Sequence, residues 1–335
     1  MFSAKQRHNR AHGHIAGLVV LAVCLVSAAL LYLNRQFILD QVSYWQYQPS
    51  SAVASLAERV SLSQTGMFYF YASHPAIEDA AQFNQECGKK EASTAILGCY
   101  NGRTISIYNV TDTQLDGIKE VTAAHEMLHA AYLRLDASEK SHIDSLLEAE
   151  YVKLKTDKDF AERMAFYDRT EPGERDNELH SIIGTEVKNI NAELETYYKK
   201  YFNDRSKVVS LHEKYASVFA NLQKRSDTLS QQLTQLEASI ESASVSYNAD
   251  LTQFNKDVDA FKAKANSDGF TTNQQYQSAR EALLARANTL DTRRQAIKSD
   301  IDRYNQLREE LLSIASQSEA LNRSINSSLA PAPSL

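Results

Sequence analysis

Two histidines and a glutamate stand together at a spacing that suits metal chemistry. The chain reads His125-Glu126-Met127-Leu128-His129, and residues i and i+4 lie on one face of a helix. The two imidazoles can therefore direct ring nitrogens at one point about 2 Å away, as Zn²⁺ requires. Glu126 can act as a general base toward water at such a metal. The pattern predicts a zinc site with Glu126 as its catalytic residue. The alternative is a chance pair of core histidines.

A helix around these residues is predicted by the apolar pattern. Asp116 is placed to cap this helix, and Glu120 lies near its first turn. We therefore expect the two histidines to lie on an inward apolar face, where a metal would be buried. The residues of that face recur at helical spacing: Ile118, Val121, His125, Leu128, His129 and Tyr132.

A β-hairpin is predicted directly before this helix. Asn101-Gly102 separates two apolar runs, 95–100 and 103–110. Asn-Gly favours a two-residue type I′ turn, because both turn positions need a positive φ. The flanking segments are predicted as helices at 51–62, 75–85, 159–164 and from 176 onward, a strand at 66–72 and a turn at 170–175.

A small sheet followed by a His-Glu-x-x-His helix resembles the zincin metallopeptidases. In that family an edge strand near the metal binds an extended peptide, and the resemblance gives that role to Thr104–Val110. It covers about residues 95–190. It implies a small α+β domain at 50–190, a zinc cofactor and a peptide or protein substrate. For the whole chain we expect an α+β fold that is predominantly helical.

A catalytic zinc site needs a third protein ligand and one open position. The Asn-Glu-x-x-Ser segment at 177–181 resembles the segment that supplies the glutamate ligand in thermolysin-like enzymes, the gluzincins. This resemblance implies Glu178 as the third ligand, with Glu186 and His180 as rivals. Ile182 stands where many gluzincins place an acid that holds the first histidine. An acceptor for that histidine must then come from elsewhere, such as a backbone carbonyl.

The resemblance also implies how the site would act. Zinc would polarise the scissile carbonyl and lower the pKa of water, and Glu126 would pass the water's proton to the leaving amine. The oxyanion that forms needs a hydrogen-bond donor. Four residues near the second motif are candidates for this donor: Tyr167, Arg169, Arg175 and His180.

The amino-terminal segment predicts a membrane anchor. Residues 1–14 are basic, and residues 15–33 are apolar or small without a charge, which is about long enough to span a bilayer. Positive flanks stay in the cytoplasm, so we expect a single-pass protein with a cytoplasmic N-terminus and the bulk of the chain outside. A cleaved signal peptide is the rival interpretation, but the apolar run is longer than a typical signal core.

The cysteines fit this topology. Cys87 and Cys99 would lie outside the membrane, where an oxidising compartment favours a disulfide between them. Two free thiols are the alternative, and the spacing is not that of a zinc knuckle. Cys24 lies inside the apolar run, where it is most simply a packing residue.

The carboxyl-terminal half predicts long helices. After residue 187 there is no proline until Pro331, and the only glycine is Gly269. Apolar residues recur at alternating three and four, which is heptad spacing, and 266–272 is a turn cluster. We expect an antiparallel coiled-coil helical hairpin at 191–327 and a disordered tail at 328–335. The hairpin would serve as a spacer, or bind a protein partner or a second copy.

Two functions remain open from the sequence. We expect no nucleic-acid partner, because the net charge is −6 and no basic cluster has interleaved aromatics. The favoured function is a membrane-anchored, outward-facing zinc metallopeptidase. The alternative is an envelope scaffold or interaction protein, in which the coiled coil is the working part and the metal site is structural or vestigial.

Overall fold

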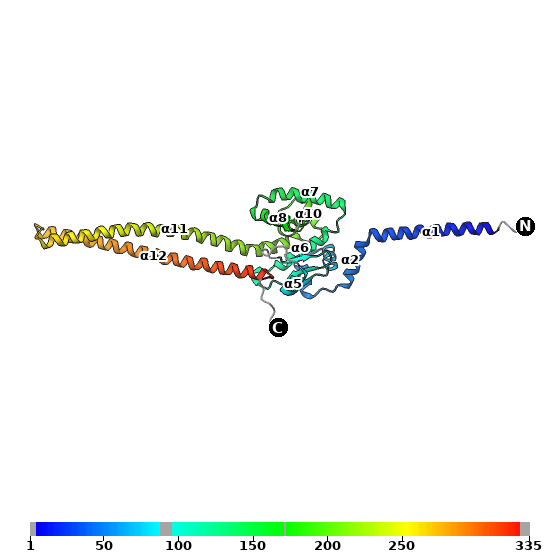
Figure 1. Cartoon of the computed structure of the whole chain (residues 1–335), viewed down its shortest axis with the longest axis horizontal. Coiled ribbons are helices and arrows are strands. Elements are labelled where there is room, and N and C mark those ends of the chain that lie inside the picture. The colour runs from blue at the N-terminus through cyan, green and yellow to red at the C-terminus, as the bar shows by residue number, and fades with distance from the viewer. Residues whose placement is uncertain (1–4, 88–95, 171, 329–335) are drawn as a thin grey trace. The chain divides into compact units, whose positions relative to one another are not determined.

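The computed structural model describes residues 5–87, 96–170 and 172–328, with side chains from Leu18 onward except at residue 159. These residues are predominantly helical and include one small three-stranded sheet (Figure 1), as the α+β prediction requires. The chain forms two compact units. We call Met1–Ser217 with Asn322–Leu335 the site unit, and Val218–Leu321 the hairpin unit.

Ten α-helices and three strands are described in the site unit before residue 205. The helices are α1 (Lys5–Leu33), α2 (Arg35–Gln46), α3 (Ser51–Arg59), α4 (Gln64–Ala72), α5 (Ala80–Glu86), α6 (Ile118–Tyr132), α7 (Ala137–Leu154), α8 (Lys158–Thr170), α9 (Arg175–Glu186) and α10 (Ala192–Tyr198). The strands are β1 (Ala76–Glu78), β2 (Gly98–Tyr100) and β3 (Ile105–Tyr108).

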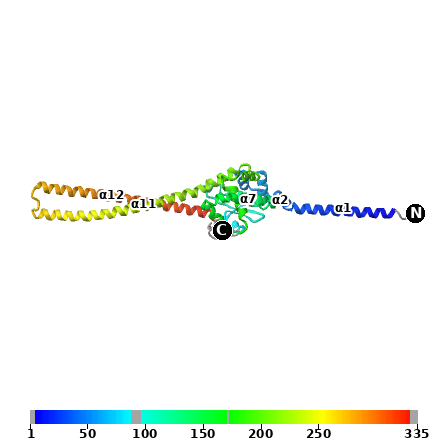
Figure 2. The same ribbon diagram turned by 90° about the horizontal axis from the view of Figure 1, so that it is seen from above.

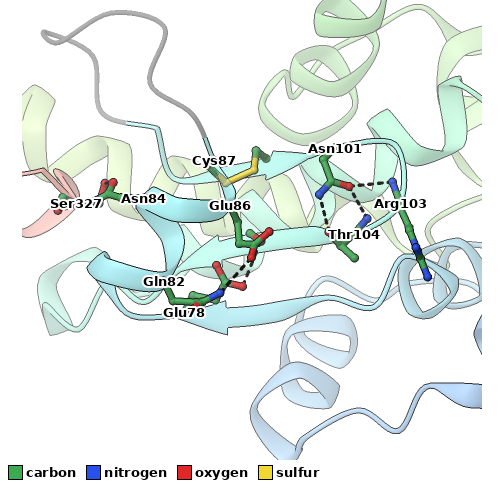
Figure 3. Close-up of a disulfide and its surroundings, with 11 residues drawn as sticks. Glu78, Gln82, Asn84, Glu86, Cys87, Asn101, Arg103, Thr104 and Ser327 are labelled. Atoms are coloured by element: carbon green, nitrogen blue, oxygen red, sulfur yellow. Dashed lines mark hydrogen bonds between the residues drawn. A yellow bond between two sulfur atoms is a disulfide. The ribbon is translucent and has the colours of Figure 1, made fainter.

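The predicted hairpin is present as β2 and β3, which pair antiparallel. The predicted two-residue turn between these strands is wrong. Tyr100 pairs with Ile105, so four residues separate the strands. The side-chain oxygen of Asn101 accepts hydrogen bonds from the N–H groups of Arg103 and Thr104 (Figure 3). This Asx-type turn replaces the two-residue type I′ turn.

The strand order corrects the prediction about the substrate edge. The order is β1-β3-β2, with β1 parallel to β3. Thr104–Val110 contains β3 and is therefore the centre of the sheet, with a neighbour on each side. The edge that approaches α6 belongs to β2, as contacts described below show. The sequence signals the hairpin but not the third strand that pairs with β3, because β1 comes from a segment about thirty residues earlier.

Two segments before the hairpin differ from their predictions. Residues 66–72 were expected as a strand but lie in α4, which begins because the Ser63 side chain accepts a hydrogen bond from the Gly66 N–H. The aromatic residues there pack against several neighbours, and tertiary packing overrides their strand preference. The helix predicted from residue 75 begins instead at α5, where the Asp79 side chain accepts from two N–H groups. β1 occupies the residues before it.

Helix α6 lies at the centre of the site unit, and nearly all of its side chains are buried. It packs against α9, α3 and α4 and against both strands of the hairpin. The predicted cap is wrong. Gly117, with φ of 104°, precedes the helix, whereas Asp116 forms ion pairs with Arg59 and Lys214. Glu120 lies in the first turn as expected.

The hairpin unit consists of parts of two long helices, α11 (Arg205–Asn266) and α12 (Asn273–Ile325). Three ion pairs join them: Arg225–Glu310, Asp250–Arg293 and Asp257–Arg286. As the residue numbers rise on α11 they fall on α12, so the helices are antiparallel. Figures 1 and 2 show them side by side, joined at one end.

The start of the helical hairpin differs from the prediction. The sequence placed the start of the hairpin at 191, but the core of the site unit includes Tyr198 of α10, Phe202 in the loop that follows, and Val208 of α11. The hairpin unit begins at Val218. After the hairpin unit ends at Leu321, the chain re-enters the site unit. There Ser327 and Asn84 form two hydrogen bonds with each other. Seven of the eight residues predicted as a disordered tail, 329–335, lie outside the described residues.

No single helix among those described from residue 18 onward is long and apolar enough to cross a membrane. Residues 18–33 of α1 and helix α2 meet the requirement only as a pair bent by 65°. The predicted anchor at 15–33 begins three residues before the first described side chain and stays a prediction. The side chains of the basic segment 1–14 lie outside the described residues.

Candidate metal centre

Helices α6 and α9 bring three potential ligands together. His125 and His129 lie one turn apart on α6, and Glu178 lies in the first turn of α9. Their ligand atoms lie within 4.8 Å of one another. The two Nε2 atoms are 3.0 Å apart. Glu178 oxygens lie 3.7 Å from Nε2 of His125 and 3.5 Å from Nε2 of His129. The arrangement offers two nitrogens and one carboxylate to a common point.

Asn177 holds the ring of His129 in its orientation. Its side-chain amide donates to Glu174 at 2.9 Å, which turns its oxygen toward Nδ1 of His129, also at 2.9 Å. Nδ1 is therefore engaged by Asn177, and Nε2 is the ring nitrogen that faces His125 and Glu178. Ligating histidines in metalloproteins are commonly held in this way. The side chain that holds a histidine of this motif is thus Asn177 on α9, and the histidine it holds is the second one, His129.

The environment of His125 is set by opposing effects. Burial by itself would lower the pKa of His125, but the hydrogen bond with Glu178 and the charges of Glu126 and Glu178 outweigh burial, and the pKa is raised. Negative charge gathered around two imidazoles favours a cation at this point, whether a proton or a metal ion.

Glu126 follows His125 on α6 and lies close to strand β2. Its side chain is buried, and β2 approaches it at Gly98. A Cβ atom at Gly98 would meet Glu126 Oε1 at 2.7 Å and Thr122 Cγ2 at 2.5 Å. Only glycine leaves room for the carboxylate here. The close approach places the edge of the sheet beside the candidate general base.

A disulfide holds this edge strand. Cys87, at the end of α5, is bonded to Cys99 in β2, with 5.9 Å between the Cα atoms (Figure 3). This is the pair that the sequence put forward. The bond ties the strand beside Glu126 to the helix on the other side of the 88–95 segment. It thereby restricts how far β2 can move from α6.

The two rival ligands are engaged elsewhere. Glu186 pairs with Arg163 and lies 3.3 Å from Nε2 of His212. His180 is fully buried, and its Nε2 lies 2.9 Å from the Tyr197 hydroxyl. Burial, together with the charges of the two other histidines, lowers the pKa of His180 to about 3. Neither rival belongs to the group that converges with His125 and His129.

Of the four candidate oxyanion donors, Tyr167 is the one influenced by the site's carboxylates. Burial and then the charges of Glu178 and Glu186 raise its pKa well above the ordinary value. The phenol therefore keeps its proton and remains a donor at neutral pH. The other three have partners away from the ligand group: Arg175 with Glu148, Arg169 with the carbonyl of Ala165, and His180 with Tyr197.

Two residues of the site were missed by the sequence reasoning. Asn177 was part of the motif that pointed to Glu178, but no role was given to it. Gly98 stands in an apolar run that was read only as a strand, although a glycine inside a strand often marks a close approach. Both signals were local and available in the sequence.

The chain matches no known protein family, no curated protein and no solved structure. Its function is therefore argued from the geometry of the site and the chemistry of its residues.

Proposed function

We propose that this chain is a zinc-dependent metallopeptidase of the gluzincin type, anchored in a membrane and facing outward. The convergence of His125, His129 and Glu178 carries the proposal. The three groups come from helices more than forty residues apart. A chance pair of core histidines would not require a buried carboxylate to meet both rings.

The residues present suit zinc. Two imidazole nitrogens and one carboxylate are a donor set of catalytic zinc sites, which keep a fourth position open. The orientation of His129 supports the same assignment, because its Nε2 faces the ligand group while its Nδ1 lies 2.9 Å from the Asn177 side-chain oxygen. His125, His129 and Glu178 would hold the ion.

Bound zinc would act as a Lewis acid that polarises a carbonyl and lowers the pKa of water. Glu126 follows His125 in the chain and would accept a proton from water and deliver it to the leaving amine. Tyr167 would donate its hydroxyl proton in a hydrogen bond to the oxyanion. The β2 edge would align an extended peptide beside Glu126, a role that the sequence had given to Thr104–Val110.

The anchor and the compartment form part of the proposal. Residues 15–33 would cross the bilayer with residues 1–14 in the cytoplasm. The disulfide between Cys87 and Cys99 supports an oxidising compartment for the site unit. The single-pass topology would then place the site outside the cytoplasm.

The second candidate function is an envelope scaffold, and the hairpin unit favours it. Its antiparallel helices carry heptad spacing and cross-helix ion pairs, which supports a coiled-coil hairpin that binds a partner or a second copy. In that case the metal would be structural or vestigial. Deletion of 218–321 would then abolish function in cells, while Glu126→Gln would be silent.

A comparison of Glu126→Gln with the wild-type full chain tests the peptidase. Both proteins would be purified in detergent, loaded with zinc and incubated with a peptide library whose cleavage is read by mass spectrometry. We expect the variant to retain zinc and to lose cleavage, because the amide cannot accept the proton. Glu58→Gln, an exposed change on α3, is the matched control. Equal cleavage by wild type and Glu126→Gln would refute the mechanism.

A further inference from the structure

Helix α2 is attached to the site unit by its polar face. Asp40 is buried and accepts two hydrogen bonds from the Arg134 guanidinium, at 2.7 and 2.8 Å. One turn later, the Ser43 hydroxyl donates to the carbonyl of Ala72 at 2.8 Å. Tyr44 packs on Phe68 of α4. The side of α2 that faces the protein is thus held by hydrogen bonds and an ion pair as well as by ring contacts.

The opposite side of α2 is apolar and exposed. Ile38, Val42 and Trp45 stand at i, i+4 and i+7, so they form one stripe along the helix. Asp40 is two residues from both Ile38 and Val42 and therefore points the other way. All three residues of the stripe are exposed, and Trp45 keeps 73% of its surface. Phe37 and Leu39 flank the stripe and are exposed as well.

This polarity is inverted relative to a helix on the surface of a water-soluble domain. Such a helix turns its apolar stripe inward and its polar face to water. α2 buries a carboxylate and exposes a tryptophan. The stripe follows directly after residues 18–33 of α1, whose side chains are apolar and exposed. A contiguous exposed apolar surface of this kind marks an interaction site.

We propose that the stripe of Ile38, Val42 and Trp45 lies against a lipid bilayer surface, so that α2 is an interfacial helix. Tryptophan and tyrosine favour the boundary between acyl chains and headgroups. The axis of α2 is bent by 65° from that of residues 18–33. A chain that leaves a membrane and then runs along its surface must make such a change of direction. The inference rests on the anchor of the proposed function and is independent of the metal.

The contact that holds α2 on the site unit is connected to the candidate metal centre. Arg134, the partner of Asp40, follows the last turn of α6, five residues after His129. Its guanidinium also donates to the Ala130 carbonyl at 2.6 Å and to the Tyr100 hydroxyl in β2 at 3.1 Å. One side chain thus joins the interfacial helix, the metal helix and the edge strand. The bilayer would therefore hold the site unit at a fixed height and orientation.

Trp45 is the only tryptophan in the chain, and its fluorescence reports on α2 alone. The full chain would be reconstituted in phosphatidylcholine vesicles, with and without lipids brominated near the headgroup. We expect a shift of the emission to shorter wavelength, strong quenching by the brominated lipid, and a several-fold fall in quenching by aqueous iodide relative to the chain in urea. Ile38→Asn with Val42→Asn should reverse all three effects. Val152→Asn, an exposed change on α7, should reverse none.

Three outcomes would overturn the inference. A chain that floats with vesicles while Trp45 stays open to iodide would retain the anchor but place α2 in water. Shielding from iodide without quenching by brominated lipid would mean that the stripe binds protein, such as a second copy. A chain that does not float with vesicles would refute both the anchor and the interfacial helix. Zinc content does not enter any of these results.

Discussion

The site unit and the hairpin unit use charge in opposite ways. In the site unit, Asp40 and Arg134 pair with side chains only 6% and 7% exposed, and Glu178 is buried beside two histidines. In the hairpin unit, the Asp250–Arg293 pair keeps 53% and 40% of its side-chain surface. Its apolar residues form a narrow seam that includes Leu233 and Leu290.

The difference shows what each unit can do. A buried polar group must find a partner of defined geometry, since an unsatisfied one costs free energy. Such groups therefore fix positions, as a catalytic site requires. An exposed ion pair costs little when it breaks, so the hairpin unit is determined by its repeating seam and supplies length.

The largest expected effect separates the two kinds of ion pair. Arg134→Met leaves the buried Asp40 without its ion-pair partner and with only the hydrogen bond from Gln36, and should lower the free energy of unfolding by about 3–5 kcal/mol. Arg293→Ala in the hairpin unit should change it by less than about 1 kcal/mol. Denaturant unfolding of the full chain in detergent, followed by far-ultraviolet circular dichroism, measures both, and Trp45 fluorescence follows the site unit separately. Similar losses for the two variants would remove the contrast.

The second effect compares apolar packing. Leu147→Ala on α7 removes a fully buried side chain from the core of the site unit and should cost about 2–5 kcal/mol of the free energy of unfolding. Leu233→Ala should cost less, because that side chain is 9% exposed in a two-helix seam and water can reach the space it leaves. The same unfolding measurement applies. A larger loss at Leu233 would show that the hairpin has the tighter core.

The third effect concerns the support of a ligand. Asn177→Ala removes the acceptor that holds Nδ1 of His129 and should weaken zinc binding by about 10- to 100-fold. Competition with a chromophoric chelator measures the affinity. The control is Asn221→Ala, an exposed change on α11 in the hairpin unit, which should leave zinc affinity unchanged. Unaltered affinity in Asn177→Ala would mean that Asn177 does not position the ring for a metal.

The smallest effect tests the contact between β2 and Glu126. Gly98→Ala forces Thr122 and Glu126 to move and should cost about 1–3 kcal/mol of the free energy of unfolding, as overpacking does. Zinc should be retained while peptide cleavage falls. Gly269→Ala is the comparison in the hairpin unit: its Cβ would meet Lys264 Cγ at 2.8 Å and the Lys264 carbonyl oxygen at 3.0 Å, and it should leave peptide cleavage unchanged. Full cleavage by Gly98→Ala would show that β2 does not constrain the base.

Features that depend on neighbouring residues were predictable from the sequence. The α6 helix and its histidine pair, the start of α9 and the β2–β3 hairpin follow from short-range spacing. The Cys87–Cys99 bond was expected from the predicted oxidising compartment. The choice of Glu178 over Glu186 and His180 rested on the resemblance of the Asn-Glu-x-x-Ser segment at 177–181 to the ligand segment of the gluzincins. In the structure Glu178 is the one of the three that meets both histidines.

Features that depend on distant partners were not predictable. The aromatic segment in α4 lacks a period that separates strand from helix, and its packing decides between them. Nothing near β3 in the sequence shows that β1 adds to its outer side. Asp40 meets Arg134 across more than ninety residues, so the polar seat of α2 was also hidden.

The most direct test of the central claim is the zinc content of the purified full chain. Wild type, His125→Ala, Glu178→Ala and Glu186→Ala would be compared by elemental analysis, with the fold checked by circular dichroism. We predict one zinc per chain in the wild type and in Glu186→Ala, and loss of zinc in the other two variants. A folded wild type that binds no zinc, or a site that depends on Glu186 and not on Glu178, would contradict the proposed centre.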